Sequence, residues 1–490
     1  MHLPVQHPNL LAAAEQIMRE NGFAVEMPPS VSQQVDGIAG AASSTIIARD
    51  DVRDLRDLLW SSIDNDTSRD LDQLEVAQAL ANGATKVLVA IADVDVFVPK
   101  DSPIDQFAAS QTTTVYLGVR NFPMLPEQLS TGITSLLEDG DKLALVIEFV
   151  VTATGELQSN SVYRALVRNK AQLTYDSVGR WLDGAAPAPP KVQQSPDLQA
   201  QLHLQNRAAE ALRSARHRHG ALNIETIESR PIVRNQEVVN LENEEKNSAT
   251  TLIEDFMIAS NEVVARFLED RHFAFIQRVV KTPARWDRIV ALAQGLGGHL
   301  PETPNSKALN EFLVARSIQD PDHFPDLSLS VIKLMGPGEY VLTRPGDDGQ
   351  SGHFGLAVDD YTHSTAPNRR FADLVTQRLV KSALAGRLSP YSDDALSTIA
   401  KACTDKANAA RKVEREMSKR IAAVAMQHRI GEEFDAIVTG VTPHGTFVRI
   451  IRPHVEGLLM DGQGLDVGDK LEVTLVRTDV DRGFIDFARR

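Results

Sequence analysis

Residues 62–73 read SIDNDTSRDLDQ and place four aspartates within nine positions. Asp70 and Asp72 are two residues apart, so in an extended segment their side chains point to the same side. Asp64 lies six residues before Asp70, across a polar run that is typical of a turn. A loop between two short strands can therefore aim these three carboxylates at one point.

Carboxylates this close repel each other strongly unless a positive charge neutralises them. Mg²⁺ prefers such oxygen ligands and is usually held by one or two carboxylates together with substrate phosphates. Divalent ions of this kind also promote in-line attack on phosphorus. The stretch therefore favours a site for Mg²⁺, with Mn²⁺ as the alternative ion. On spacing alone, a solvated acidic loop or a capping cluster explains the pattern equally well.

The composition of the 490-residue chain is that of an ordinary globular protein, with 42% hydrophobic and 24% charged residues. We expect two to four domains and no signal peptide. We also expect no membrane contact, because no apolar run approaches the roughly 20 residues of a spanning helix. Cys403 is the single cysteine, which excludes intrachain disulfides and thiolate metal cages and argues against a disulfide-linked partner. A cytoplasmic location is the default expectation.

The formal net charge of −15 argues against a general electrostatic binder of nucleic acid. Positive charge must then be concentrated locally. The predicted helix from about Asp393 to His428 is the most basic stretch and could line the mouth of an RNA channel. A surface face linked by salt bridges would account for part of it.

A second stretch of chemical interest reads YTHSTAPNRRFAD, from Tyr361 to Asp373. Pro367 is predicted to start a helix with Arg369 and Arg370 in its first turn. Cations oppose the helix dipole there, so the pair makes more sense if an anion such as a phosphate is bound. Equally, the arginines could bind the protein's own Asp373 or the acidic loop.

Apolar and alternating runs predict a large α/β region that begins near residue 44. Asp93 and Asp95 follow its first buried strand, and such residues more often brace a turn or a neighbouring arginine than bind metal. Before this region, a helix is expected near the N-terminus, broken by Pro28-Pro29 and by Gly37 to Gly40, in a small helical or winged-helix module or a packing arm. Strands are expected at 87–91, 143–150 and 158–166, and helices at 10–19, 197–218, 251–270 and 286–296.

Taken together, these stretches resemble the RNase II (RNB-domain) family of exoribonucleases over about residues 46–430. The resemblance implies an α+β multidomain fold, with a small module at 1–45, an RNB catalytic domain of mixed sheet and surrounding helices at 46–429, and an S1 domain at 430–490. It also implies processive 3′→5′ hydrolysis of single-stranded RNA to 5′-nucleoside monophosphates by a monomer. It rests on the motifs at 63–73, 90–94, 123–126, 252–261 and 361–373.

The same resemblance assigns roles to individual residues. It implies that Asp64, Asp70 and Asp72 organise Mg²⁺ and the attacking water. Arg369 matches the arginine that contacts the scissile phosphate, and Arg370 beside it is a further candidate for RNA binding.

Two more candidates lie outside these motifs. Tyr116 occupies the position of an aromatic residue that stacks on the terminal base, unless it is a core or turn tyrosine. Glu414 resembles a glutamate near the 3′ nucleotides, unless it pairs with Arg411 or Lys412 on its own helix.

Gln73 departs from the family pattern, which usually has a fourth aspartate at this position. A glutamine oxygen can still bind a hard cation, but it carries no charge. Either Gln73 is a metal ligand through its amide, or Asp66 or a substrate oxygen substitutes, or the enzyme is inactive.

The β-rich segment 430–490 resembles an S1 domain, a five-stranded OB-type barrel that binds single strands. Phe447 is the first candidate for base stacking, with His444 and Phe434 in support; a core phenylalanine is the alternative. About 45 residues before the catalytic region cannot hold the two cold-shock modules usual in the family, so we expect better tolerance of structured RNA. The alternative functions are a catalytically weak RNA-binding or regulatory protein and a metallo-phosphodiesterase that acts on DNA.

Overall fold

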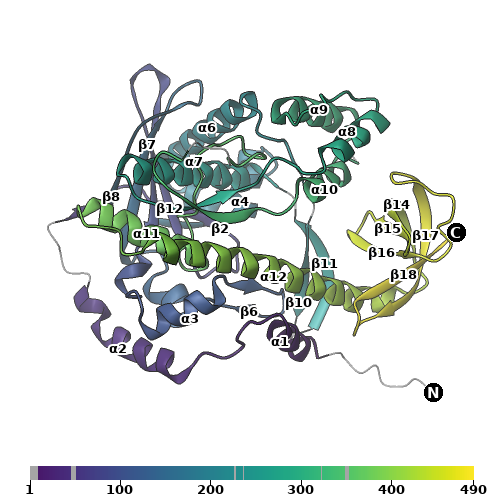
Figure 1. Cartoon of the computed structure of the whole chain (residues 1–490), viewed down its shortest axis with the longest axis horizontal. Coiled ribbons are helices and arrows are strands. Elements are labelled where there is room, and N and C mark those ends of the chain that lie inside the picture. The colour runs from purple at the N-terminus through teal and green to yellow at the C-terminus, as the bar shows by residue number, and fades with distance from the viewer. Residues whose placement is uncertain are drawn as a thin grey trace.

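The predicted combination of an α+β catalytic region and a small C-terminal barrel is confirmed by the computed structural model (Figure 1). The long helix α12 (Asp393–Met426) runs from the catalytic region to the barrel. None of the described helices combines the length and the apolar character that crossing a membrane requires. The structure describes residues 9–45, 51–225, 228–234, 237–244, 246–321, 323–347 and 352–490.

A seven-stranded mixed sheet forms the centre of the catalytic region, in the order β1-β8-β7-β4-β3-β2-β9. Its central strand β4 reads TKVLVAIA, and β-branched and apolar residues suit a strand that is covered on both faces. The inner pairs are antiparallel, and the outer pairs β1–β8 and β2–β9 are parallel. The strands are β1 Val52–Asp54, β2 Ser61–Asp64, β3 Gln73–Ala79, β4 Thr85–Ala92, β7 Asp141–Val151, β8 Leu157–Arg168 and β9 Ala171–Thr174.

Helix α7 (Ser248–Asp270) covers one face of this sheet. Phe149 on β7 meets Phe256 on α7 edge to face, with ring centroids 6.4 Å apart. Helix α6 (Pro196–Arg218) lies beside α7 and contacts β3. The remaining elements of this region are α3 Pro103–Gln111, β5 Val115–Tyr116, β6 Asn121–Phe122, α4 Tyr175–Leu182, α5 Pro190–Gln193, β10 Glu228–Arg234, β11 Glu237–Glu244, β12 Phe275–Val279, α8 Trp286–Gly295, α9 Ser306–Gln319, α10 Phe324–Met335, β13 Glu339–Thr343 and α11 Phe371–Leu384.

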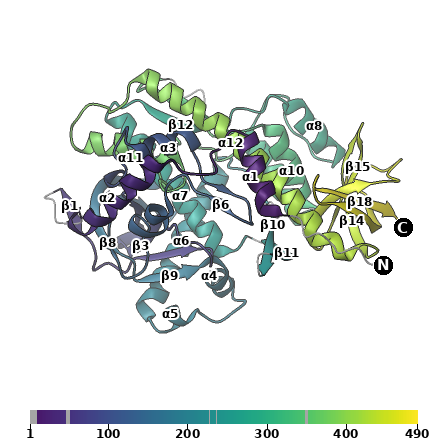
Figure 2. The same cartoon turned by 90° about the horizontal axis from the view of Figure 1, so that it is seen from below.

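Two helices form the described part of the first 45 residues, which contains no strand. Helix α1 (Leu10–Glu20) lies where the sequence predicts a helix and packs against α12 (Figure 2). Helix α2 (Pro29–Thr45) runs through the glycines that were expected to interrupt it, so that expectation was wrong. Val31 and Val35 of α2 are buried in the main core, and this packing outweighs the modest helix cost of glycine.

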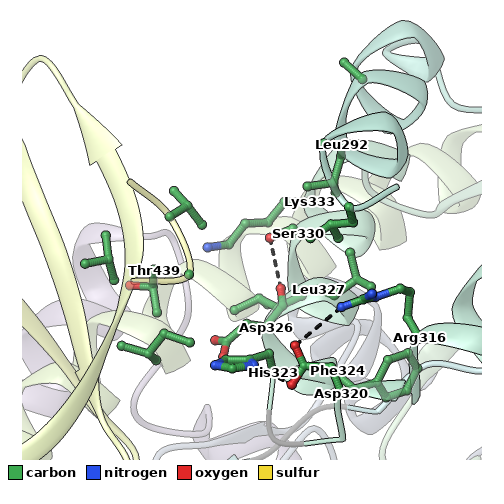
Figure 3. Close-up of a pocket in the computed structure, with 18 residues that line it drawn as sticks. Leu292, Arg316, Asp320, His323, Phe324, Asp326, Leu327, Ser330, Lys333 and Thr439 are labelled. Atoms are coloured by element: carbon green, nitrogen blue, oxygen red, sulfur yellow. Dashed lines mark hydrogen bonds and ion pairs between the residues drawn. The ribbon is translucent and has the colours of Figure 1, made fainter. Parts of the chain in front are cut away.

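The C-terminal unit is the predicted five-stranded barrel, closed in the order β14-β15-β16-β18-β17. An ion pair of 2.7 Å joins Arg449 of the barrel to Asp326 of α10. Beside it, a cavity of about 380 Å³ separates α10 from the barrel, with Lys333 on one wall and Thr439 on the other (Figure 3). The barrel strands are β14 Glu433–Thr442, β15 Gly445–Ile450, β16 Val455–Leu459, β17 Lys470–Asp479 and β18 Phe484–Arg489.

Candidate functional site

The acidic stretch forms a loop between β2 and β3, as the sequence predicts. Asp64 is the last residue of β2. Its carboxylate accepts hydrogen bonds from the Asn65 amide at 2.8 Å and from the Ser68 hydroxyl at 2.6 Å. The Ser68 amide also donates to the Asn65 carbonyl at 3.1 Å, which closes the expected turn. Ser68 thus positions a candidate ligand, a role that the sequence did not suggest.

Asp72 joins this loop to the second chemical stretch, 296 residues further along the chain. Asp72 is buried, with 2% of the residue exposed. The backbone amide of Asn368 donates to its carboxylate at 3.0 Å, and Arg369 Nε lies 3.5 Å from Asp72 Oδ2. The structure therefore brings the acidic loop and Arg369 together, as a nuclease site requires.

Tyr116, on strand β5, also contacts the loop. Its hydroxyl donates to Asp70 Oδ2 at 3.0 Å, while 41% of the residue is exposed. Tyr116 is therefore a partly exposed aromatic ring that a hydrogen bond anchors beside the acidic loop, and the structure does not place it in the core.

Electrostatics show that this loop is short of positive charge. Burial raises the pKa of Asp72 to about 7; Arg369 and the Asn368 amide oppose the rise, and the charge of Asp70 adds to it. Burial likewise raises the pKa of Asp64, although the hydrogen bonds from Ser68 and Asn65 and the positive charge of Arg369 lower it. A divalent cation would supply the positive charge that Arg369 alone does not provide.

The carboxylates have the chemistry that suits a divalent cation, but they are spread along the loop. Asp64, Asp70 and Asp72 offer only oxygen ligands, which Mg²⁺ prefers. Within the described ranges, no three His, Cys, Asp or Glu side chains are close enough together to hold a metal ion. Full coordination thus requires the loop to close on the ion or a substrate oxygen to complete the shell.

Gln73 begins β3 and is buried there. Two residues further on, Glu75 is 0% exposed, and neither of its carboxylate oxygens has a hydrogen-bond partner among the described residues. Burial raises the pKa of Glu75 well above its usual value, and the charge of Asp64 raises it further. Sequence reasoning missed Glu75, although an acidic residue directly between the apolar Leu74 and Val76 was a signal.

The two adjacent arginines, Arg369 and Arg370, have different surroundings. Helix α11 begins at Phe371, so the prediction that it starts at Pro367 was wrong. The Asp373 carboxylate accepts a hydrogen bond from the Ala366 amide at 2.8 Å, which holds the preceding residues in a turn. Arg370 donates twice to Asp373, at 2.8 and 2.6 Å, so the alternative that it binds the protein's own carboxylate is observed.

The Arg369 side chain remains 44% exposed beside Asp72. It is therefore the arginine of the pair that can reach a phosphate.

Asp93 and Asp95 brace neighbouring cations, as predicted. Asp93 pairs with Arg164 at 3.1 Å and with Lys381 at 2.8 Å. Asp95 pairs with Lys381 and Arg378, both at 2.8 Å. The protein itself neutralises this second acidic group.

The other candidates lie along α12 and in the barrel. Glu414 is half-buried on α12, a helix that contacts β5. On the barrel, His444 is exposed and Phe447 is half-buried. The supporting role for Phe434 was wrong, because its ring is buried and packs edge to face against Phe487, with centroids 6.5 Å apart.

Comparisons with known proteins agree with this architecture. The RNB domain model matches residues 52–386, and the model of the RNase II-type exonuclease C-terminal S1 domain matches residues 432–490. Ribonuclease R of Vibrio cholerae is 31% identical over 89% of this chain and 53% of that protein. Ribonuclease R of Thermotoga maritima is 30% identical over 94% of this chain and 68% of that protein.

Solved structures show the same fold at lower identity. The apo form of Mycoplasma genitalium RNase R is 23% identical, with a TM-score of 0.87 over 98% of this chain and 78% of that one. The chain spans little more than half the length of the first curated relatives that it matches, 53% in one and 59% in another.

Proposed function

Since this chain belongs to the RNB-domain family, we propose that it is an exoribonuclease that hydrolyses single-stranded RNA processively from the 3′ end to 5′-nucleoside monophosphates. The observation that carries the proposal is the meeting of Arg369 with Asp72 at 3.5 Å, beside two further aspartates. The curated relatives named ribonuclease R support it. A cytoplasmic location and a monomeric state remain predictions from the sequence.

Asp64, Asp70 and Asp72, with the amide oxygen of Gln73, would hold Mg²⁺ or alternatively Mn²⁺. When bound, such an ion supplies an activated water and stabilises the leaving alkoxide. The raised pKa values of half-buried Asp64 and buried Asp72 support this assignment, because a nearby cation stabilises the ionised form of both acids.

Arg369 would place its exposed guanidinium against the scissile phosphate. The Asn368 amide donates a hydrogen bond of 3.0 Å to the Asp72 carboxylate, and this bond fixes the segment that carries Arg369. Positive charge at that point stabilises the negative charge that develops on the phosphate oxygens in the transition state.

Tyr116 would stack on the terminal base. Its hydrogen bond to Asp70 at 3.0 Å sets the orientation of the ring relative to the acidic loop. Stacking tolerates any sequence, because every base has a π face. Glu414 and the basic surface of α12 would contact the adjacent nucleotides, with little contribution from Arg370.

The barrel would guide RNA toward this site through Phe447 and His444. We also propose that structured RNA is tolerated; a neighbour of the same fold, Mycoplasma genitalium RNase R, has been solved in complex with double-stranded RNA. A duplex with a 3′ overhang tests this extension. Stalling several nucleotides before the duplex would reject it.

The main proposal is tested with 5′-labelled RNA in Mg²⁺. We expect a ladder of products that shortens from the 3′ end, no reaction in excess EDTA, and no reaction on DNA of the same sequence. Intact RNA, or DNA cut as fast as RNA, would overturn the proposal.

A catalytically weak RNA-binding or regulatory protein is the second candidate, because Gln73 removes one negative charge from the site. Yeast Ssd1, described as a pseudonuclease, shares the fold with a TM-score of 0.71 at 15% identity. Under this alternative the protein binds the labelled RNA but leaves it intact, and Gln73→Asp increases the rate of degradation.

A further inference from the structure

Arg278, on strand β12, has a half-buried side chain that makes no ion pair with a carboxylate among the described residues. Its Nη1 atom is buried and has no hydrogen-bond partner in that part of the chain. The guanidinium lies over the ring of Tyr340 instead, with its Cζ 4.7 Å from the ring centroid. A charge removed from water is costly unless it is paired, so this arginine points to a missing anionic partner.

The surroundings of Arg278 add positive charge and not negative charge. Burial lowers the pKa of Arg278; Tyr340 opposes this change, and the charges of Arg411 and Arg370 add to it. Arg411 is exposed on α12, against which both β12 and β13 pack. Its guanidinium donates to a neutral oxygen of its own helix, that of Asn408, at 2.8 Å. An anion at this point would therefore be attracted by both Arg278 and Arg411.

This cationic place adjoins the arginine that we assign to the scissile phosphate. The Arg278 amide donates to the Tyr361 carbonyl at 2.7 Å, which attaches β12 to the stretch that carries Arg369. His363 lies in that stretch. Burial lowers the pKa of His363 well below its usual value, and the charges of Arg370, Arg278 and Arg369 lower it further. Arg278 and Arg369 therefore lie near the same histidine ring.

We propose that Arg278, with Arg411 beside it, binds the RNA phosphate next to the scissile one. This inference rests on the proposed nuclease. In degradation from the 3′ end, the scissile phosphate is the last one of the RNA, so the second phosphate comes from its 5′ side. A guanidinium with free N–H groups binds a phosphate through two parallel hydrogen bonds. Arg278 would thus hold the RNA in register with Arg369 and the acidic loop.

RNA with one neutral linkage tests the assignment. Fluorescence anisotropy in an Asp72→Asn background, which prevents degradation, measures the affinity for oligonucleotides with a single 2′-O-methyl methylphosphonate near the 3′ end. The control RNA carries the 2′-O-methyl group and an ordinary phosphate. We expect Arg278→Met to weaken binding of the control RNA about 10-fold or more. A methylphosphonate at the second linkage should weaken binding similarly when Arg278 is present and cause no further loss in Arg278→Met. Losses that add would overturn the proposal.

Salt dependence gives an independent measure. Each phosphate contact of a single strand contributes about −0.7 to the slope of the logarithm of the binding constant against the logarithm of salt concentration, so Arg278→Met should make the slope less negative by about this amount. Arg271→Met is the matched control, because its guanidinium also lies over a ring, that of Phe267, at 4.9 Å, but at the end of α7. It should leave the slope unchanged.

The same measurements separate RNA binding from a purely structural role. If Arg278 only supports Tyr340, Arg278→Met changes the melting temperature and not the salt slope, and this result would overturn the proposal. If Arg278→Met does not fold, Arg278→Gln must show the same change of slope. Failure of the unaltered protein itself to bind RNA would instead reject the proposed function.

Discussion

Two groups of carboxylates lie at the same end of the central sheet and have opposite electrostatic surroundings. Asp72 precedes β3 and Asp93 follows β4, and the Ala92 amide donates to the Asp72 carbonyl at 3.0 Å. Asp93 and its neighbour Asp95 are paired with Arg164, Arg378 and Lys381. The acidic loop has Arg369 at 3.5 Å from Asp72.

The pKa values reflect this difference. Burial would raise the pKa of Asp95, but Lys381 and Arg378 outweigh it and the pKa is lowered. Burial raises the pKa of Asp72 to about 7, and Arg369 does not offset it. The comparison teaches that nearby cations, and not the spacing of the acids, separate a structural cluster from a candidate metal site.

The largest effect is expected for Asp72→Asn. Loss of this carboxylate removes a proposed metal ligand and the partner of Arg369, so RNA degradation should fall by at least about 10³-fold. RNA binding should persist. Degradation of 5′-labelled RNA and a filter-binding assay measure the two quantities, and full activity of the variant would contradict the assignment.

In the other group, Asp93→Asn should act on stability. The substitution takes one buried partner from both Lys381 and Arg164, which keep Asp95 and Asp51, so the free energy of unfolding should fall by less than the about 3–5 kcal/mol that follows when a buried ion pair is fully broken. Urea denaturation of the two variants in EDTA checks the contrast, with Asp72→Asn expected to be at least as stable as the unaltered protein. Equal losses of stability in both variants would show that the two groups of carboxylates do not differ in their contribution to stability.

Metal-free protein should lose stability with rising pH because of Asp72. Since burial raises its native pKa to about 7, the native state retains a proton that the unfolded state has released above about pH 4. Between these values Asp72 alone lowers the free energy of unfolding by about 1.4 kcal/mol per pH unit. Thermal melts in EDTA should show this slope in the unaltered protein but not in Asp72→Asn, and saturating Mg²⁺ should reduce it. Identical slopes would argue against a cation-deficient site.

The smallest effect concerns Tyr116. Tyr116→Ala should weaken RNA binding by about 1–3 kcal/mol, the usual range for one stacked base. Tyr116→Phe keeps the ring and loses only the hydrogen bond to Asp70, so most of the affinity should remain. Fluorescence anisotropy with both variants, in an Asp72→Asn background that prevents degradation, measures the difference. If both weaken binding equally, the hydroxyl and not the ring makes the contact.

Local sequence patterns predicted the elements that position the site. The apolar run of β4, the pair β7–β8 and the barrel strands lie where periodicity placed them, because each of these patterns is read within one segment. The sequence did not predict that α2 continues through its glycines, because packing against the core decides this. It also did not predict that α11 begins only at Phe371, because the Asp373 carboxylate holds the preceding residues in a turn.

The contacts of the acidic loop with other parts of the chain were harder to predict from the sequence. Spacing alone could not tell Asp72 from Asp93, since the cations that distinguish them come from distant segments. The link from Tyr116 to Asp70 spans 46 residues and had no local signal. Glu75 was visible as an acid between two apolar residues, but only the structure showed that its oxygens are buried and unpartnered among the described residues.

Anomalous diffraction from crystals grown with Mn²⁺ and a non-hydrolysable RNA would locate the ion directly. We expect a peak among Asp64, Asp70 and Asp72, with an RNA phosphate between the ion and Arg369. No peak there, or a peak beside Asp93 and Asp95 instead, would contradict the assignment of the acidic loop as a metal site.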